Sequence, residues 1–485
     1  MDCTPVEEED MIPDVEMSLN FMELPYEEAL QQYLTELPSR ISQEFMEATP
    51  VMEFLRGEGA AVFNPKSWDG IVMEPVDFEI DENLPREIKP YRSKVPHGLE
   101  EPYKKELERL TKYLYVPSNS SIASPVVVAK KKTYPFIRLC GDYKRVNKYL
   151  RVPKYPIPDV ILELHKVTEF PIYIDCDVTN AYHQMPITRR VARLLSLQTP
   201  FGQFEPRFMP EGVSPASMAL MSVMRDIFRD FLDWMIVIHD NMLILCRDYG
   251  DAYEKLVQVI RRCQERNLYL KLSKSSFGLK KVNFFGYDCE GGSYSLSDER
   301  KLSVTSIPFP RDTKAMQRFL GASMYFRPFI FKYSEKTANL NDMTHKDFNW
   351  DEKTWTVDYK GCFELFKKDI LHSFTLTHPD FSLDWFLYVD ASDIAVGGVL
   401  VQKTVEGVQQ VVAFVSQKFS KTARAWSTYE KEAYGMCYAV RELRQYLQGK
   451  FFTLLTDHRN LVWIETSIVP KVIRMRLFCR LSTSR

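Results

Sequence analysis

Two apolar segments of this chain each lead directly into an aspartate. Residues 171–177 read Pro-Ile-Tyr-Ile-Asp-Cys-Asp, and residues 234–240 read Trp-Met-Ile-Val-Ile-His-Asp before Asn241 and a second apolar run. The pattern predicts a strand that ends at Asp177 and a hairpin that carries Asp240 at its turn. Carboxylates that converge from separate elements are the hard oxygen ligands that Mg²⁺ needs for phosphoryl transfer. An Asp-Asn pair between apolar runs is also an ordinary turn signal, so both interpretations stand at this point.

The length and composition of the chain indicate several globular domains. Its 485 residues suit about three domains, each able to bury its own core. No apolar run reaches the roughly 18 residues that span a bilayer, so no membrane partner is expected. The nine cysteines include no Cys-x-x-Cys pair, which argues against a zinc knuckle and favours a reducing compartment.

The net charge of −2 conceals two segments of opposite charge. Residues 1–90 hold 22 Asp or Glu against 5 Lys or Arg, and the rest of the chain holds 43 acidic and 58 basic residues. A phosphate backbone would repel the first segment and attract the second. We interpret residues 1–84 as an acidic, partly disordered leader that keeps the chain soluble.

A series of ordered motifs between about residues 85 and 480 resembles a known family. The motifs include Arg-Leu-Cys-Gly-Asp-Tyr-Lys-Arg-Val-Asn-Lys (138–148), Asp-Val-Thr-Asn-Ala-Tyr-His-Gln (177–184), Met-Pro-Glu-Gly-Val-Ser-Pro-Ala (209–216), Asn-Phe-Phe-Gly (283–286), Tyr-Val-Asp-Ala-Ser-Asp (388–393) and Thr-Asp-His (456–458). In this order they resemble the reverse transcriptase and ribonuclease H region of gypsy-type LTR retrotransposon Pol polyproteins. The resemblance implies an α+β fold, with a right-hand polymerase of fingers, palm and thumb before a ribonuclease H-like α/β domain.

The resemblance also implies a division into domains. Fingers and palm are expected over residues 85–301, a thumb-like segment over 302–345 and a connector over 346–383. A ribonuclease H-like domain is expected over 384–485. We expect this domain to be truncated, because the family's fourth carboxylate and last helix lie beyond the segment that matches here.

Two metal-binding aspartates are expected in the polymerase site. By resemblance, Asp177 and Asp240 hold two Mg²⁺ or Mn²⁺ ions that activate the primer 3′-hydroxyl and bind the triphosphate. Asn241 stands where the family usually has a third carboxylate, so we expect an active enzyme that is sensitive to the choice of metal. Tyr182 matches the aromatic residue that excludes a 2′-hydroxyl, although the residue type alone equally suits a core aromatic.

Further residues match the family's nucleotide-binding positions. Lys131 and Arg138 match the pair that grips the triphosphate, although the lysines at 130–132 alone would suit a solvated turn. Gly212 matches a backbone position that lets the template–nucleotide pair come close. Lys274 matches, more loosely, a general acid for pyrophosphate, and Glu211 stands where Phe or Gln is common.

The C-terminal segment carries three carboxylates that match the ribonuclease H site. By resemblance Asp390, Glu432 and Asp457 bind two metal ions that hydrolyse the RNA strand of an RNA–DNA hybrid. Ser427 and Glu430 match a capping box, which predicts that a helix begins here and carries Glu432 near its start. The expected buried face of this helix excludes Glu432 and contains Ala433, Met436, Cys437, Val440, Leu443 and Leu447. Each carboxylate alone would also suit a strand-end cap or an exposed helix position.

The leading hypothesis is an RNA-directed DNA polymerase with an attached, incomplete ribonuclease H domain. Its expected partners are an RNA template, a DNA primer, an RNA–DNA hybrid, dNTPs and other Pol products such as protease and integrase. Its expected location is a cytoplasmic virus-like particle, with the nucleus as the alternative. Two competing hypotheses are a catalytically decayed or host-adopted copy that binds nucleic acid, and a purely structural interaction protein.

Overall fold

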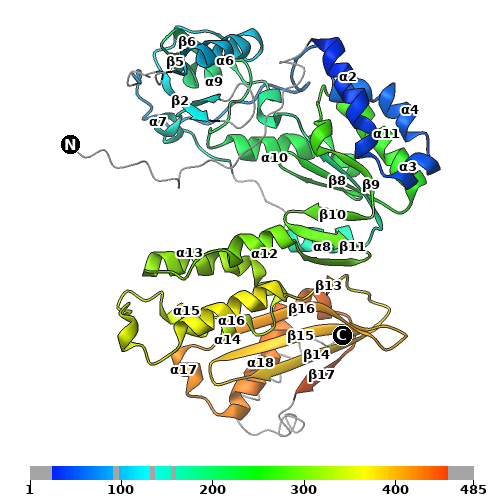
Figure 1. The fold of residues 1–485 in the computed structure, drawn as a ribbon, viewed down its shortest axis with the longest axis vertical. Coiled ribbons are helices and arrows are strands. Elements are labelled where there is room, and N and C mark those ends of the chain that lie inside the picture. Colours follow the sequence, from blue (N-terminus) through cyan, green and yellow to red (C-terminus); the bar gives the residue numbers. More distant parts are fainter. Residues whose placement is uncertain (1–24, 91–94, 96–97, 131–136, 154–159, 457–485) are drawn as a thin grey trace. The chain divides into compact units, whose positions relative to one another are not determined.

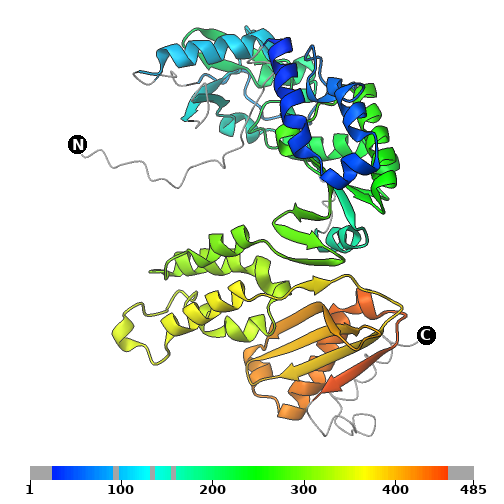
Figure 2. The ribbon, with the colours of Figure 1, turned by 45° about the vertical axis from the view of Figure 1, so that its right-hand side comes forward.

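The computed structural model describes residues 25–90, 95, 98–130, 137–153 and 160–456. The chain divides into two compact units, which are described separately. Unit 1 comprises residues 1–159 and 172–280, and unit 2 comprises residues 160–171 and 281–485. Figures 1 and 2 show helices and sheets in both units, which confirms the mixed α+β class. No helix in the described part of the chain is long and apolar enough to cross a membrane.

Unit 1 is built around a four-stranded antiparallel sheet in the order β7-β8-β4-β9. Its strands are β4 (Ile172–Asp177), β7 (Met235–Ile238), β8 (Asn241–Cys246) and β9 (Ser276–Leu279). Nearly every side chain of β4, β7 and β8 is buried, because α10 (Ala216–Ile227) contacts β7 and α11 (Tyr249–Glu265) contacts β4 and β8. Strands buried in this way read as continuous apolar runs. The two runs that precede the paired aspartates are therefore parts of one sheet.

A second sheet of unit 1 has five strands in the order β1-β6-β5-β2-β3. They are β1 (Tyr115–Pro117), β2 (Ser124–Lys130), β3 (Ile137–Gly141), β5 (Leu197–Thr199) and β6 (Gly202–Pro206). The helices and turns around the two sheets are α6 (Glu100–Tyr113), α7 (Lys144–Asn147), η3 (Ala181–Gln184), α9 (Arg189–Leu194), η4 (Arg229–Phe231) and η5 (Leu272–Lys274). β2 and β3 form an antiparallel pair, in which Val128 lies opposite Leu139.

Residues 25–84 belong to the core of unit 1, which corrects the prediction of a leader over residues 1–84. They contain α2 (Tyr26–Glu36), η2 (Leu37–Arg40), α3 (Gln43–Ala48), α4 (Val51–Arg56) and α5 (Ala60–Phe63). Leu37 and Phe45 are fully buried, and the Ser42 N–H donates to the Phe277 carbonyl on β9. Most acidic side chains of these helices are exposed while their apolar faces are packed, so charge alone was misleading. Residues 1–24 lie outside the described residues.

Unit 2 contains a sheet in the order β10-β11-β12-β13. Its strands are β10 (Lys281–Phe284), β11 (Tyr287–Glu290), β12 (Ser293–Leu296) and β13 (Leu376–Thr377), and α8 (Val160–Thr168) contacts β11 and β12. Its other helices before the last sheet are α12 (Asp298–Thr305), α13 (Thr313–Ser323), η6 (Met324–Phe329), α14 (Tyr333–Lys336), α15 (Ala338–Asp342), η7 (Glu352–Thr354) and α16 (Tyr359–Leu371). Because β12 pairs with β13, the predicted boundary at residue 301 does not coincide with the division between the units.

The last sheet of unit 2 has the order β16-β15-β14-β17. Its strands are β14 (Asp384–Ala391), β15 (Ala395–Lys403), β16 (Gln409–Lys418) and β17 (Phe452–Thr456), and β17 runs parallel to β14. Between β16 and β17 come α17 (Lys421–Arg424), α18 (Thr428–Glu442) and α19 (Arg444–Leu447), with α18 packed on β14, β15 and β16 (Figures 1 and 2). From residue 384 the order of elements is therefore a strand, a hairpin, helices and a last strand.

Candidate active sites

Asp177 and Asp240 are held at one end of the central sheet of unit 1. Asp177 is the last residue of β4 and is paired with Asn241, the first residue of β8. The Val178 N–H donates to the Asp240 carbonyl at 3.0 Å. His239 and Asp240 form a two-residue turn between β7 and β8, and His239 adopts a φ of 55°. Such turns favour left-handed residues because their twist then matches that of the strands. The predicted strand end and hairpin turn are confirmed.

A cleft of about 460 Å³ opens at this end of the sheet. The lining includes six residues for which the sequence predicted a role: Asp177, Tyr182, Gly212, Asp240, Asn241 and Lys274. It also includes Glu211 and four polar residues to which the sequence assigned no role: Asn180, Ser217, His239 and Lys271. The cleft therefore collects side chains from β4, η3, the segment before α10, the β7–β8 turn and η5.

Burial and neighbouring charges determine the pKa of Asp177. Burial raises this pKa to about 6; Lys274 opposes the shift and Asp240 adds to it. The Lys274 Nζ lies 3.6 Å from the Asp177 Oδ2. Burial also raises the pKa of Asp175 on the same strand to about 7, and the charge of Asp177 adds to that shift. A cation in the cleft would relieve both the desolvation and the repulsion of these carboxylates.

Lys271 is a cleft residue that the sequence did not reveal. Its N–H donates to the Asp177 carbonyl at 2.8 Å, and the residue is only 8% exposed. Its charge lowers the pKa of Asp177. The only local signal was a second lysine three residues before Lys274, which is too common a pattern to identify a site.

Tyr182 lies on η3 in the wall of the cleft. It is half-buried, burial raises its pKa, and the nearby Ser217 opposes that shift; the Ser217 Oγ lies 3.3 Å from the His239 Nδ1. The N-terminal segment supports the same turn, because the Trp68 Nε1 donates to the His183 carbonyl at 3.0 Å. These contacts hold Tyr182 beside the paired aspartates, while its role as a steric gate stays a prediction.

Arg138 lies on β3 and forms an ion pair with Glu211, which lines the cleft. Its Nη1 lies 3.1 Å from the Oε2 of Glu211. Gly212 follows with a φ of 84°, a conformation that favours glycine, and its carbonyl accepts a hydrogen bond from the Asn147 Nδ2 at 2.9 Å. Lys131, the predicted partner of Arg138 in triphosphate binding, lies outside the described residues.

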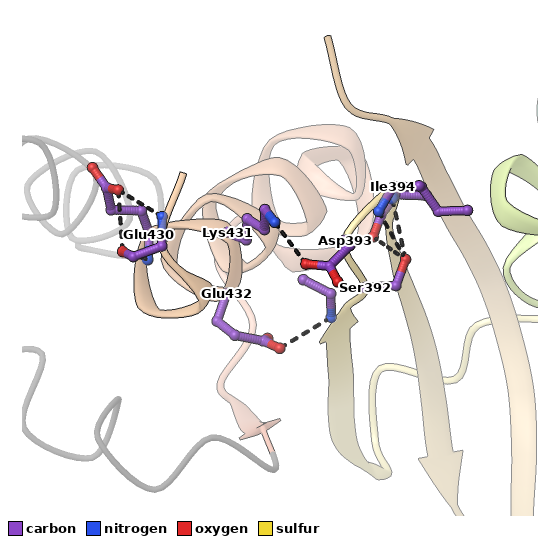
Figure 3. Close-up of polar contacts among 9 residues, drawn as sticks. Ser392, Asp393, Ile394, Glu430, Lys431 and Glu432 are labelled. Carbon is purple, nitrogen blue, oxygen red and sulfur yellow. Dashed lines mark hydrogen bonds and ion pairs between the residues drawn. The ribbon is translucent and has the colours of Figure 1, made fainter. Parts of the chain in front are cut away.

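The ribonuclease H-like part of unit 2 places two of its three predicted carboxylates near one end of its sheet. Asp390 lies near the end of β14 and forms an ion pair with Lys332, which precedes α14. Glu432 lies on α18, and its Oε1 accepts a hydrogen bond from the Ala391 N–H at 3.3 Å (Figure 3). Asp457 lies outside the described residues. Both described carboxylates thus already have a partner within unit 2.

The start of α18 follows the sequence prediction closely. Ser427 accepts from the Glu430 N–H, and the Glu430 side chain accepts from the Ser427 N–H, so the capping box is confirmed. Figure 3 shows the next residue, Lys431, directed towards Asp393, with which it forms an ion pair of 2.8 Å. This ion pair connects the helix start to the loop after β14.

The buried face of α18 differs from the predicted one. Glu432 is only 3% exposed, although the prediction placed it outside the apolar face, whereas Met436 and Cys437 are half-buried. The reason is the close approach of the helix to the sheet at Gly435. A Cβ atom at this position would lie only 2.7 Å from the Val396 side chain. The close approach buries the helix face that carries Glu432.

Two stretches of the chain match known families. Residues 128–289 match the reverse transcriptase (RNA-dependent DNA polymerase) family, and residues 380–480 match the RNase H-like domain found in reverse transcriptase. The chain is therefore similar to reverse transcriptases over these two stretches. The whole cleft of unit 1 lies within the first match, and Asp390 and Glu432 lie within the second.

Retrotransposon polyproteins are among the relatives of this chain. The transposon Tf2-7 and Tf2-3 polyproteins of Schizosaccharomyces pombe are 30% and 29% identical to it over 394 residues. Each alignment covers 80% of this chain and 29% of the polyprotein, so the chain spans less than a third of these curated relatives. The resemblance to gypsy-type LTR retrotransposons is confirmed.

Solved structures share the fold of this chain. The foamy viral protease-reverse transcriptase dRH in complex with ds DNA has a TM-score of 0.77 at 17% identity, covering 94% of this chain and 79% of that chain. The foamy viral protease-reverse transcriptase in complex with RNA/DNA hybrid has a TM-score of 0.68 at 18% identity, covering 94% and 61%. The predicted right-hand polymerase followed by a ribonuclease H-like domain is confirmed as a fold.

Proposed function

We propose that this chain is an RNA-directed DNA polymerase that extends a DNA primer on an RNA template with dNTPs. The observation that carries the proposal is the convergence of Asp177 and Asp240 in one cleft with Tyr182, Gly212 and Lys274. The relatives captured with ds DNA and with an RNA/DNA hybrid support nucleic acids of these kinds as partners.

The oxygen donors of the cleft fit a divalent cation. Asp177 and Asp240 offer carboxylates and Asn241 offers an amide oxygen, all hard donors of the kind that Mg²⁺ and Mn²⁺ prefer. The raised pKa of Asp177 reflects burial and repulsion that a cation would relieve. Two ions per site would lower the barrier to attack by the primer 3′-hydroxyl and neutralise the phosphates. Among the described residues, no three His, Cys, Asp or Glu side chains are grouped so that they could hold a metal ion. In the cleft, the donor beside the two aspartates is the amide oxygen of Asn241.

The other cleft residues bind and orient the nucleotide in this proposal. Tyr182, supported by Ser217, packs against the deoxyribose and leaves no space for a 2′-hydroxyl. Arg138 and Lys131 bind the triphosphate through charge-assisted hydrogen bonds. Gly212 admits the template–nucleotide pair, and Lys274 gives a proton to the departing pyrophosphate.

The described part of the ribonuclease H-like site does not fit metal ions in its present arrangement. Asp390 is paired with Lys332, and Glu432 accepts a hydrogen bond from a backbone amide. The ammonium group of Lys332 therefore compensates the negative charge of Asp390 that would attract dications. We propose that Asp390, Glu432 and Asp457 form the site that cleaves RNA in an RNA–DNA hybrid, with little activity while Lys332 holds Asp390.

Primer extension on an RNA template tests the polymerase proposal. Extension is measured with dNTPs in Mg²⁺ and separately in Mn²⁺, beside the Asp240→Asn variant. We expect extension by the unaltered chain in at least one metal and none above background by the variant. Absence of extension in both metals, with hybrid binding intact, would refute the proposal.

The amide at Asn241 favours a second candidate, a decayed or host-adopted copy that binds nucleic acid without catalysis. Such a protein would bind an RNA–DNA hybrid with a steep dependence on salt, since backbone binding releases counterions, but would not extend a primer. We further propose that the polymerase acts in a cytoplasmic virus-like particle, or in the nucleus, beside other Pol products such as protease and integrase.

A further inference from the structure

Glu211 places a carboxylate in a cleft that must accept a polyanion. The titratable side chains in the cleft lining include the carboxylates of Asp177, Glu211 and Asp240 and the ammonium groups of Lys271 and Lys274. Asp177 and Asp240 have an evident use as metal-binding groups, but Glu211 has none in the proposed reaction. An unused carboxylate beside a triphosphate site opposes binding by like-charge repulsion unless a cation neutralises it.

Arg138 supplies that cation. Its Nη1 lies 3.1 Å from the Glu211 Oε2, and the arginine side chain is 14% exposed while the glutamate side chain is 33% exposed. The two residues are 73 positions apart in the sequence, so the pair forms only in the folded chain. A guanidinium is planar and has five N–H donors, which also suit a phosphate group. The Glu211 carboxylate and an incoming triphosphate therefore compete for the guanidinium group of Arg138.

The backbone at Glu211 is fixed while its side chain is accessible to solvent. Asn147 holds the next turn from both sides: its Nδ2 donates to the Gly212 carbonyl at 2.9 Å, and its Oδ1 accepts from the Ser214 N–H at 3.0 Å. Arg138 is fixed on β3, which pairs with β2 along its whole length. A rotation of the partly exposed Glu211 side chain thus suffices to break its contact with Arg138.

We propose that Glu211 is a specificity-determining residue of the nucleotide site, because its carboxylate holds Arg138 in the free enzyme and the triphosphate must displace it. The inference rests on the proposed polymerase function. A triphosphate carries enough charge to displace a single carboxylate, whereas a nucleoside monophosphate competes poorly. Glu211 acts through Arg138, so it lowers the affinity for every nucleotide but lowers it most for weakly charged ones.

The test compares Glu211→Gln with the unaltered chain. The KM for dTTP and kcat are measured by primer extension, and equilibrium binding of dTTP is measured separately with Ca²⁺ in place of Mg²⁺. Because the variant removes charge and keeps shape, we expect the KM and the dissociation constant to fall about fivefold with kcat unchanged. The inhibition constant of dTMP should fall by a larger factor. In 0.5 M salt, the differences between the variant and the unaltered chain should become smaller, because salt screens the charges.

Two further variants make the result specific. Glu211→Asp keeps the charge and should restore a KM close to that of the unaltered chain. Glu58→Gln breaks an Arg–Glu pair elsewhere in unit 1, between Glu58 and Arg261 at 2.8 Å, and should leave the KM unchanged. Circular dichroism and melting temperature check that every variant is folded.

Opposite outcomes have distinct meanings. An unchanged KM and dissociation constant in Glu211→Gln would overturn the inference. A raised KM would also overturn it, by showing that the carboxylate orients Arg138 for the triphosphate. If the unaltered chain extends no primer, the proposed function fails, and the dTTP binding comparison still decides the role of Glu211.

Discussion

The two carboxylate sites of this protein differ in how their charges are compensated. In unit 1, Asp177 and Asp240 face the same cleft, and the pKa of Asp177 is raised to about 6 although Lys274 lies 3.6 Å away. In unit 2, Asp390 is paired directly with Lys332, and Glu432 accepts a backbone hydrogen bond. Repulsion between buried carboxylates destabilises the first site, whereas in the second site Lys332 compensates the charge of Asp390.

This difference shows how one fold can provide a site that favours metal binding and another site that binds metal ions less readily. Buried carboxylates that repel each other destabilise the protein and gain when a cation arrives. A carboxylate that already has a lysine partner must break that ion pair before it binds a metal, which weakens the apparent affinity. Sites of the first kind exchange stability for function.

The largest expected effect is the loss of polymerase activity in Asp177→Asn. We expect primer extension to fall about 10³-fold or more, because the variant removes a carboxylate that positions the metal ions at the reacting phosphate. The matched variant Asp390→Asn, which changes a carboxylate in the other unit, should extend primers normally. Residual activity above a tenth in Asp177→Asn would contradict the assignment of the polymerase site.

The second expected effect concerns the stability of the metal-free protein against pH. Asp175 and Asp177, with pKa values raised to about 7 and about 6, keep protons in the folded chain that the unfolded chain loses near pH 4. The unfolded state then binds fewer protons, so stability should fall by several kcal/mol as the pH rises from 4 to 7, since each unit of pKa shift contributes about 1.4 kcal/mol.

Urea unfolding in EDTA measures this pH dependence. In Asp177→Asn the decline should be smaller, since one carboxylate is gone and the pKa of Asp175 loses the repulsion of Asp177. Asp390→Asn should instead lower stability at pH 7, because it leaves Lys332 without that ion pair. If the free energy of unfolding had the same pH dependence in the unaltered chain and in Asp177→Asn, the inferred electrostatic difference between the two sites would be wrong.

The third expected effect is a gain of ribonuclease H activity in Lys332→Met. Removing the ammonium group frees Asp390 for metal ions, so we expect cleavage of the RNA strand of a hybrid to rise about tenfold. The affinity of the protein for Mn²⁺, measured from the electron paramagnetic resonance signal of free Mn²⁺, should rise in the same variant. The matched control Lys336→Met breaks the ion pair between α14 and Asp369 and should change neither quantity.

The smallest expected effect is that of Asn241→Asp in the polymerase cleft. An added carboxylate beside two dications strengthens their binding, so extension in Mg²⁺ should be preserved or rise by about two- to fivefold. The ratio of Mn²⁺-dependent to Mg²⁺-dependent activity should fall. A decrease of Mg²⁺-dependent extension would show that the amide serves this site better than a carboxylate does.

Local sequence patterns predicted the elements that carry the site residues. The apolar runs before Asp177 and Asp240 became neighbouring strands, and the capping box of Ser427 and Glu430 starts α18 as expected. These features depend on residues close together in the chain, where strand periodicity and capping geometry act directly. The order of motifs identified the family for the same reason, because it needs no knowledge of tertiary contacts.

The partners of several charged residues were not predictable in this way. The contact of Arg138 with Glu211, the ion pair of Lys332 with Asp390 and the place of Lys271 in the cleft all join distant segments. Packing also decided the burial of residues 25–84, where exposed acidic side chains hid apolar faces that contact the central sheet.

The sequence by itself determined which strands and helices form and which carboxylates end them, since short-range backbone preferences and apolar periodicity fix both. Only the tertiary structure decided how those carboxylates are compensated. Coulomb energy depends on the distance and the burial of each partner, and folding sets both quantities for residues that lie far apart in the chain.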